Sequence, residues 1–339
     1  MSGGDDKTIH DAFIGVARVL GDAPALVKGQ EDAVDGAGMD GPVRVGVPSR
    51  SISFGQLWAV CNAFASHLET QETKDVRIRT TGPPMTDERG ALIVGATAAV
   101  MLDSSDELMV AYFASLISGY SFAPIETSLP PSSVEGLLES LRASANLAHL
   151  IVGEEDNTTG SNSHKPISSL SFTSPPPPIR TFAISLRHDQ RWNLSVSELT
   201  EVVPGMKPVK PLTLFGDASI VISFRGTPDD ACHIIHTGGS TGRPKAVVCS
   251  HRGSMYSHAA RAAALPYNTT DDDDDADVTG VCVFGVWDAV CALLAGSRAS
   301  MLPVGGVRVG LEAIFSLCDV PFIQFCPVTG TATQSLHTS

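Results

Sequence analysis

The residues best suited to chemistry lie in one stretch, which reads HIIHTGGSTGRPKAVVCSH from His233 to His251. Consecutive glycines let a backbone come close to a polyphosphate and turn its N–H groups toward it. The hydroxyls of Thr237, Ser240 and Thr241 add hydrogen-bond donors, and Lys245 adds a positive charge. This combination predicts a phosphate-binding loop. Its residues are Thr237, Gly238, Gly239, Ser240, Thr241, Gly242 and Lys245.

Other motif templates compete for the same stretch. A Walker loop fails because Gly242 is followed by Arg243 rather than lysine, and a dinucleotide fingerprint fails on its glycine spacing. The run from Gly238 to Gly242 does match G-x-S-x-G, so a serine hydrolase with Ser240 as nucleophile is an alternative. That elbow needs a strand, a tight turn and then a helix, whereas Pro244 and the β-branched residues behind it predict a strand. A plain hairpin turn is the structural alternative.

Alternating strand and helix patterns on either side of the loop predict the elements that position it. The predicted strands cover residues 25–27, 43–47, 91–102, 149–152, 219–224 and 233–236, and the predicted helices begin at Thr8, Ser53, Leu108, Ser133 and Val286. Ser53 and Gln56 form a capping box. Such alternation predicts an α/β fold with a doubly wound, mostly parallel sheet.

Composition limits the function further. The chain has 339 residues and a formal net charge of −14, which disfavours nucleic acid and anionic membranes as partners. Its seven cysteines form no CxxC pair and are typical of a reducing compartment. The N-terminus has no signal-peptide pattern, and the apolar run 91–102 is too short for a membrane span. These features predict a cytoplasmic protein.

Two polar stretches are predicted as surface loops. Residues 154–178 are rich in serine and end in four prolines. Residues 271–277 begin with five aspartates, but Ala276 replaces the glycine that a calcium loop requires. We therefore expect a solvated acidic loop there rather than a metal site.

The stretch from Ile234 to Lys245 resembles the signature loop of the adenylate-forming superfamily. That superfamily includes acyl-CoA synthetases, luciferases and the adenylation domains of nonribosomal peptide synthetases. Three other stretches are similar to the family in the same order: SISFGQLWAVCNAFASHL, AAVMLDSSDELMVAYFASLISGYSFAPIETSLP and FGVWDAVCALLAGSRASML. The resemblance runs from about residue 9 to about residue 327. It implies the front part of the family's large N-terminal domain, with doubly wound sheets and flanking helices.

The resemblance also implies a reaction. A small carboxylic acid attacks the α-phosphate of ATP, in the presence of Mg²⁺, and forms an acyl-adenylate and pyrophosphate. A thiol, from CoA or from the phosphopantetheine of a carrier protein, then takes the acyl group. In this scheme residues 237–242 hold the β- and γ-phosphates, and Lys245 offsets their charge. His236 is either a structural residue of the strand or a residue of the phosphate site.

Departures from the family pattern set two further expectations. We find no adenine motif, ribose aspartate or lid lysine, so residues 1–8 are expected to be a polar tail and residues 9–339 an incomplete large domain without the C-terminal lid. A non-catalytic fragment or degenerate binding module is the corresponding alternative. Val283 takes the place of the aspartate that holds an amino group in amino-acid-activating members. Because an apolar side chain cannot pair with an ammonium ion, a plain carboxylic acid is favoured.

Overall fold

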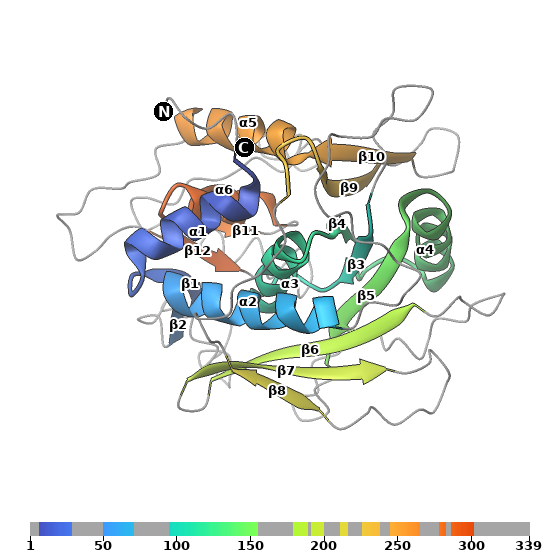
Figure 1. The fold of residues 1–339 in the computed structure, drawn as a ribbon, viewed down its shortest axis with the longest axis horizontal. Coiled ribbons are helices and arrows are strands. Elements are labelled where there is room, and N and C mark those ends of the chain that lie inside the picture. Colours follow the sequence, from blue (N-terminus) through green and yellow to red (C-terminus); the bar gives the residue numbers. More distant parts are fainter. Residues whose placement is uncertain are drawn as a thin grey trace, which may run out of the picture.

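Two β-sheets enclose a layer of helices in the computed structural model, which describes residues 7–28, 50–70, 95–154, 179–188, 191–199, 211–215, 226–237, 245–264, 278–282 and 286–301 (Figure 1). The helices are α1 (Ile9–Leu20), α2 (Phe54–Thr70), α3 (Asp106–Ile117), α4 (Pro131–Ala145), α5 (His251–Ala264) and α6 (Trp287–Leu294). The strands are β1 (Pro24–Lys28), β2 (Arg50–Ser53), β3 (Thr97–Met101), β4 (Ser121–Pro124), β5 (Leu147–Gly153), β6 (Arg180–His188), β7 (Trp192–Leu199), β8 (Leu212–Phe215), β9 (Ala231–Thr237), β10 (Lys245–Ser250), β11 (Val278–Cys282) and β12 (Arg298–Met301).

Local capping explains where the first two helices begin. The side chain of Thr8 accepts a hydrogen bond from the Asp11 amide while Asp11 reaches back to the Thr8 amide, so the predicted start of α1 is confirmed. The predicted box at the start of α2 is present as well, with Ser53 and Gln56 bonded reciprocally at 2.9 and 3.2 Å. Both devices span three residues, which is why the sequence reveals them.

The other three predicted helix starts need correction. Helix α4 begins at Pro131 instead of Ser133, since proline suits the first helical position, where no intrahelical donor is needed. Helix α3 begins at Asp106 rather than Leu108, because the side chain of Ser105 caps it by accepting from the Leu108 amide. Helix α6 begins one residue after Val286, which is its N-cap.

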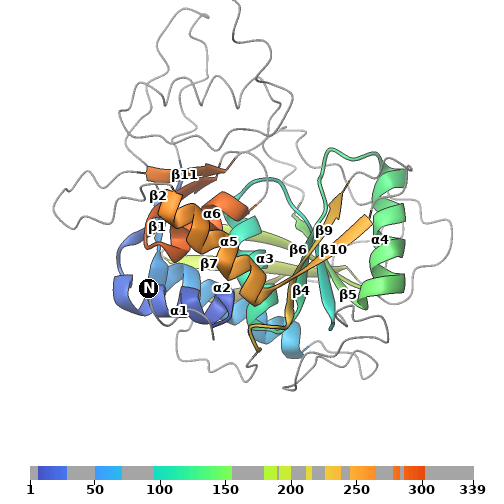
Figure 2. The same cartoon turned by 90° about the horizontal axis from the view of Figure 1, so that it is seen from above.

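The larger sheet has the strand order β10-β9-β4-β3-β5-β6-β7-β8. Strands β9, β4, β3, β5 and β6 are parallel to one another, while β10 at one end and β7 and β8 at the other pair antiparallel. Side chains alternate across β3: Ala98 and Val100 pack on the side of α3, and Ala99 and Met101 pack on the side of α4. Figure 2 shows α4 on the opposite side of this sheet from α2 and α3. The doubly wound α/β prediction is confirmed, with antiparallel additions at both ends.

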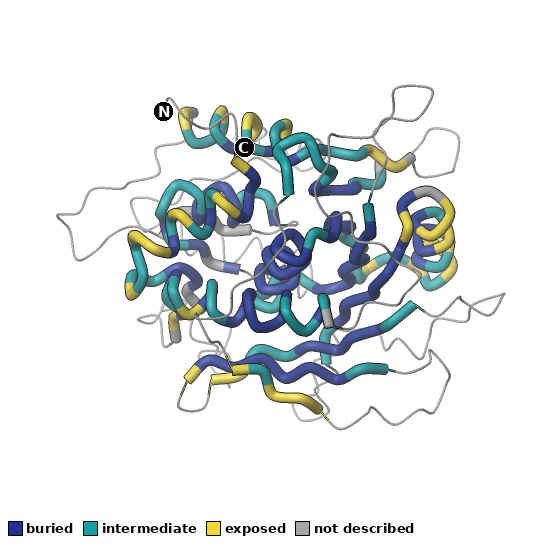
Figure 3. The backbone as a smooth tube through the Cα atoms, viewed as in Figure 1, coloured by how far each residue is buried: buried dark blue, intermediate teal, exposed yellow. Residues whose placement is uncertain are grey.

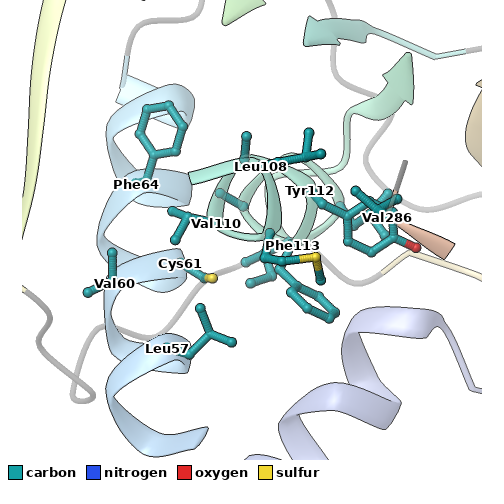
Figure 4. Close-up of a cluster of buried hydrophobic side chains, with 14 of the residues drawn as sticks. Leu57, Val60, Cys61, Phe64, Leu108, Val110, Tyr112, Phe113 and Val286 are labelled. Atoms are coloured by element: carbon teal, nitrogen blue, oxygen red, sulfur yellow. The ribbon is translucent and has the colours of Figure 1, made fainter. Parts of the chain in front are cut away.

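Helix α3 is the centre of the core. Every residue from Leu108 to Ile117 is buried, and a helix that is apolar all round needs cover on every side. The tube in Figure 3 is dark blue along this helix. In Figure 4 the side chains of Leu57 and Cys61 on α2 point toward α3. The smaller sheet, ordered β11-β12-β1-β2, contributes Leu26, Ile52 and Ala299 to the same core.

Some predictions lie outside the described residues. These are the strands at 43–47 and 219–224, the acidic stretch 271–275 and nearly all of the loop 154–178. The predicted strand 91–102 is shorter where it is described, since β3 covers Thr97–Met101. Among the helices that the structure describes, none has both the length and the apolar character needed to cross a bilayer.

Candidate functional site

The predicted phosphate loop joins two antiparallel strands. Strands β9 and β10 pair antiparallel from Ala231 and Ser250, with a register shift between Cys249 and Ser250, to a closing pair formed by Thr237 and Lys245. The connection between the two closing residues is the glycine-rich stretch, and Gly238–Gly242 lie outside the described residues, as do the side chains of Thr237 and Lys245. The backbone of the closing pair therefore brings the two ends of the predicted loop side by side.

The strand that precedes this loop ends at the carboxyl edge of the parallel strands. Strand β9 runs parallel to β4, with Phe122 opposite His233, and β4 runs parallel to β3. Helices α3 and α4 follow β3 and β4 but cover opposite faces, so the connections diverge between these two strands. In open α/β sheets ligands bind outside the carboxyl ends of the strands at such a switch point. The loop leaves the carboxyl end of β9, next to that point.

Polar side chains cross the switch point itself. Thr127, after β4, donates a hydrogen bond from its hydroxyl to the carboxylate of Asp103, after β3. The Ile125 amide donates to the Val100 carbonyl at 2.8 Å, which extends the pairing of the two strands. Asp103 was not singled out from the sequence, although its position directly behind the predicted strand 91–102 was an available signal. Within the described residues, no group of three or more His, Cys, Asp or Glu side chains is arranged to hold a metal ion.

His236 lies on β9 immediately before the loop. Among the described residues neither of its ring nitrogens has a hydrogen-bond partner, although both atoms are shielded from solvent. Burial lowers the pKa of this imidazole, so it is neutral at physiological pH. A neutral, shielded imidazole at this position is compatible with a structural residue of β9 and with a residue of the phosphate site.

A buried hydrogen-bond network anchors the strand that leads into the loop. The Tyr112 hydroxyl lies 2.7 Å from Nε2 of His233, and Nδ1 of the same ring lies 3.0 Å from the hydroxyl of Ser254. Cys232 Sγ is 3.2 Å from that hydroxyl. The network ties β9 to α3 and α5, and sequence reasoning missed it because its members come from three distant segments.

The start of α5 is held by the turn before β9. The His251 amide donates to the Asp230 carbonyl at 3.0 Å, and the Arg252 amide donates to the Pro228 carbonyl at 2.6 Å. The guanidinium of Arg252 also binds both carboxylate oxygens of Asp229, at 2.7 and 3.1 Å. The hairpin is therefore braced at the end opposite the loop.

Helix α6 forms part of the core. Val286, Val290 and Leu293 are all buried, and Leu294 is partly buried against the same core. Arg261 of α5 forms an ion pair with Asp288 of α6. This pair joins α6 to the helix that directly follows β10. Val283, at the position expected to meet a substrate amino group, lies outside the described residues.

The strand arrangement counts against the serine-hydrolase alternative. Behind Ser240 the chain enters β10, and α5 starts only after that strand ends at Ser250. A nucleophile elbow requires a helix directly behind the serine. We expect no covalent labelling of Ser240 by a fluorophosphonate probe, measured by intact mass with an active serine hydrolase as positive control. Stoichiometric labelling that is abolished in Ser240→Ala would reverse the ranking.

Comparison with known proteins agrees with this architecture. A family model described as "AMP-binding enzyme" matches residues 90–332. The chain is 26% identical over 217 residues to nonribosomal peptide synthetase sidC of Aspergillus fumigatus, covering 64% of this chain and 4% of that protein. It is 25% identical over 207 residues to tyrocidine synthase 2 of Brevibacillus parabrevis, covering 60% of this chain and 4% of the relative. The chain thus spans a small fraction of these relatives.

Solved structures show the same fold. The N-terminal subdomain of Klebsiella oxytoca NpsA matches with a TM-score of 0.54 at 17% identity, over 93% of this chain and 60% of that one. CmiS6 matches with a TM-score of 0.54 at 17% identity, over 94% of this chain and 58% of the other. The family match extends over most of the chain and includes the whole β9–β10 hairpin with its glycine-rich connection. The chain belongs to the AMP-binding enzyme family of adenylate-forming proteins.

Proposed function

We propose that the connection between β9 and β10 holds the β- and γ-phosphates of ATP. The observation that carries the proposal is the closing pair Thr237–Lys245, which sets a glycine- and hydroxyl-rich loop at the carboxyl edge of the parallel strands. Backbone amides of such a loop make a concave site for anions. Lys245 adds a positive charge that offsets part of the charge of the phosphates.

The chemistry that this site supports is activation of a carboxylic acid. The carboxylate oxygen attacks the α-phosphorus of ATP, the bond to the bridging oxygen breaks, and pyrophosphate leaves with both electrons of that bond. Holding the leaving phosphates steady lowers the barrier by positioning and by charge stabilisation. Mg²⁺ accompanies the nucleotide, whose phosphate oxygens are its preferred ligands. The acyl-adenylate then passes its acyl group to a thiol, from CoA or from phosphopantetheine on a carrier protein, and AMP leaves.

Membership of the AMP-binding enzyme family supports formation of an acyl-adenylate. We further propose a domain assignment, a class of acid and a thiol acceptor. We assign residues 9–339 to the large N-terminal domain of such an enzyme, with residues 1–8 as a polar tail. Val283 favours an acid without an α-amino group, because an apolar side chain leaves an ammonium ion unpaired. The peptide synthetases among the relatives support a carrier-protein thiol as the acceptor.

Lys245→Ala tests the phosphate site. We expect the variant to bind Mg-ATP and Mg-pyrophosphate more weakly by roughly 1–3 kcal/mol, about 5- to 150-fold, since a charge-assisted contact is lost. Isothermal titration calorimetry measures both affinities. Lys7→Ala is the matched control, because Lys7 is an exposed lysine just before α1 and should leave both affinities unchanged.

Equal affinities in wild type and Lys245→Ala would overturn the assignment. Acid-driven exchange of labelled pyrophosphate into ATP, over a panel of aliphatic and aromatic acids, then separates the enzyme from the binding module. Exchange that Lys245→Ala weakens supports acid activation. Nucleotide binding without exchange for any acid supports the non-catalytic alternative.

A further inference from the structure

Four histidines are buried where α1, β9 and α5 meet. His10 lies on α1, His233 on β9, and His251 and His258 on α5, and none is more than 6% exposed. We refer to these four residues as the histidine cluster. The acid activation discussed above does not require the cluster, so its presence needs a separate explanation.

The contact between α1 and α5 is made by two of these rings. The rings of His10 and His251 meet edge to face, with centroids 5.5 Å apart. The Ile9 amide donates a hydrogen bond to Nδ1 of His251 at 3.3 Å. An acceptor nitrogen carries no proton, so His251 is neutral with its proton on Nε2. Protonation of Nδ1 removes the acceptor that joins the first turns of the two helices.

The other two histidines of the cluster are His233 and His258. His233 is bonded to Tyr112 and Ser254 and packs edge to face on Trp287 of α6, with centroids 4.5 Å apart. Nδ1 of His258 is buried without a partner among the described residues, while its carbonyl accepts from the Cys291 thiol at 3.4 Å. A charge on either ring would have little compensation in this packing.

The groups that face the cluster add little negative charge. Asp11 of α1 favours a proton on His10, but burial outweighs it and lowers the pKa of His10 to about 4. Arg261 of α5 disfavours a proton on His258, whose pKa burial lowers to about 4, and Arg261 is itself paired with Asp288 of α6. Among the described residues, three further titratable neighbours are uncharged at neutral pH because burial raises their pKa values; they are Tyr112 of α3, Cys232 of β9 and Cys249 of β10. Arg252, which follows His251, is paired with Asp229.

We propose that the α1–α5 contact is a pH-sensitive latch, which protonation of His10 and His251 opens and which thereby frees one side of the β9–β10 hairpin. Above pH 6.5 the rings are neutral in both the closed and the open state, and the latch keeps its full stability. Below that pH the histidines bind protons in the open state but remain neutral in the closed state. Each such histidine raises the opening constant about tenfold per pH unit until its closed-state pKa is reached, which for His10 is about 4.

Hydrogen exchange with peptide resolution tests the latch. After correction for the intrinsic pH dependence of exchange, the opening constant of α1 and α5 should rise at least about 100-fold per pH unit between about pH 5.5 and pH 4.5, since His10 and His251 each take up a proton and His258 can add a third where α5 itself opens. Strands β6 and β7, far from the cluster in Figure 1, should keep their protection over this range. His251→Asn keeps an acceptor near the position of Nδ1 but cannot titrate, so the slope should fall by about a factor of ten per pH unit relative to the wild type.

His188→Asn is the matched control, because His188 is an exposed histidine on β6 and should leave the slope unchanged. His10→Asn gives a second, independent reduction of the slope if His251→Asn does not fold. Two results would overturn the proposal. One is loss of protection in β6 and β7 together with α1 and α5, which is global acid unfolding. The other is a wild-type slope in a folded variant of either histidine.

Discussion

Phe113→Ala is expected to lower the free energy of unfolding by about 3–5 kcal/mol, the range for removing a large aromatic side chain from a core. Phe113 is fully buried on α3 and stacks on Phe13 of α1, with ring centroids 3.9 Å apart. Its ring also meets Tyr112 edge to face, at 5.1 Å. The substitution would therefore leave a cavity between α1 and α3. Denaturant unfolding followed by circular dichroism measures the change.

Phe215→Ala is the matched control for this substitution. Phe215 lies on β8 with 47% of its surface exposed, and the Arg191 guanidinium sits 4.1 Å from its ring centroid. An exposed aromatic residue with one cation–π contact is worth about 1 kcal/mol or less. If Phe113→Ala destabilised the protein no more than Phe215→Ala, the stacked pair would not be part of a packed core.

Trp192→Ala should destabilise the protein by a similar amount, about 3–5 kcal/mol. Trp192 is 8% exposed at the start of β7, and its indole N–H donates to the Ser51 carbonyl of β2 at 3.1 Å. This bond joins the larger sheet to the smaller one. Removing the indole takes away both the packing and the link between the two sheets, so a lower midpoint in denaturant is expected.

Trp192→Phe separates the two contributions. Phenylalanine keeps most of the apolar contact but has no donor, and Ser51 is exposed enough for water to reach its carbonyl. We expect a loss of about 0.5–1.5 kcal/mol for this variant, the net value of one hydrogen bond. A loss in Trp192→Phe as large as in Trp192→Ala would show that packing around the ring matters little and would contradict the proposed role.

The sequence by itself determined the features that depend on neighbouring residues. The capping boxes at Thr8 and Ser53 act over three residues, so the starts of α1 and α2 were predictable. The nearly continuous apolar pattern of Leu108–Ile117, in which Ser115 is polar, predicted a helix, and the structure shows this helix buried on all sides. The phosphate loop expected from Thr237 to Lys245 also rests on consecutive residue types, and it stays a prediction.

Local sequence patterns did not predict the start of α4 or the strands β6 to β8. Pro131 starts α4 two residues before the predicted Ser133, since proline at the first helical position loses no hydrogen bond. The segment that became β6, β7 and β8 has no pattern clear enough to place it beforehand. Its strands are defined by pairing with β5 and with each other, and strand propensity depends strongly on such partners.

Only the tertiary structure decided which distant residues meet. Thr127 reaches Asp103 because β3 and β4 lie side by side at the switch point, and no spacing in the sequence reports that adjacency. Ile9 and His251 are bonded across 242 positions of the chain. Whether a histidine is a neutral core residue or a charged surface residue depends on what covers it, since burial is what lowers its pKa. The prediction for the loop therefore rests on its own consecutive residues, whereas the contacts around it are set by the tertiary structure.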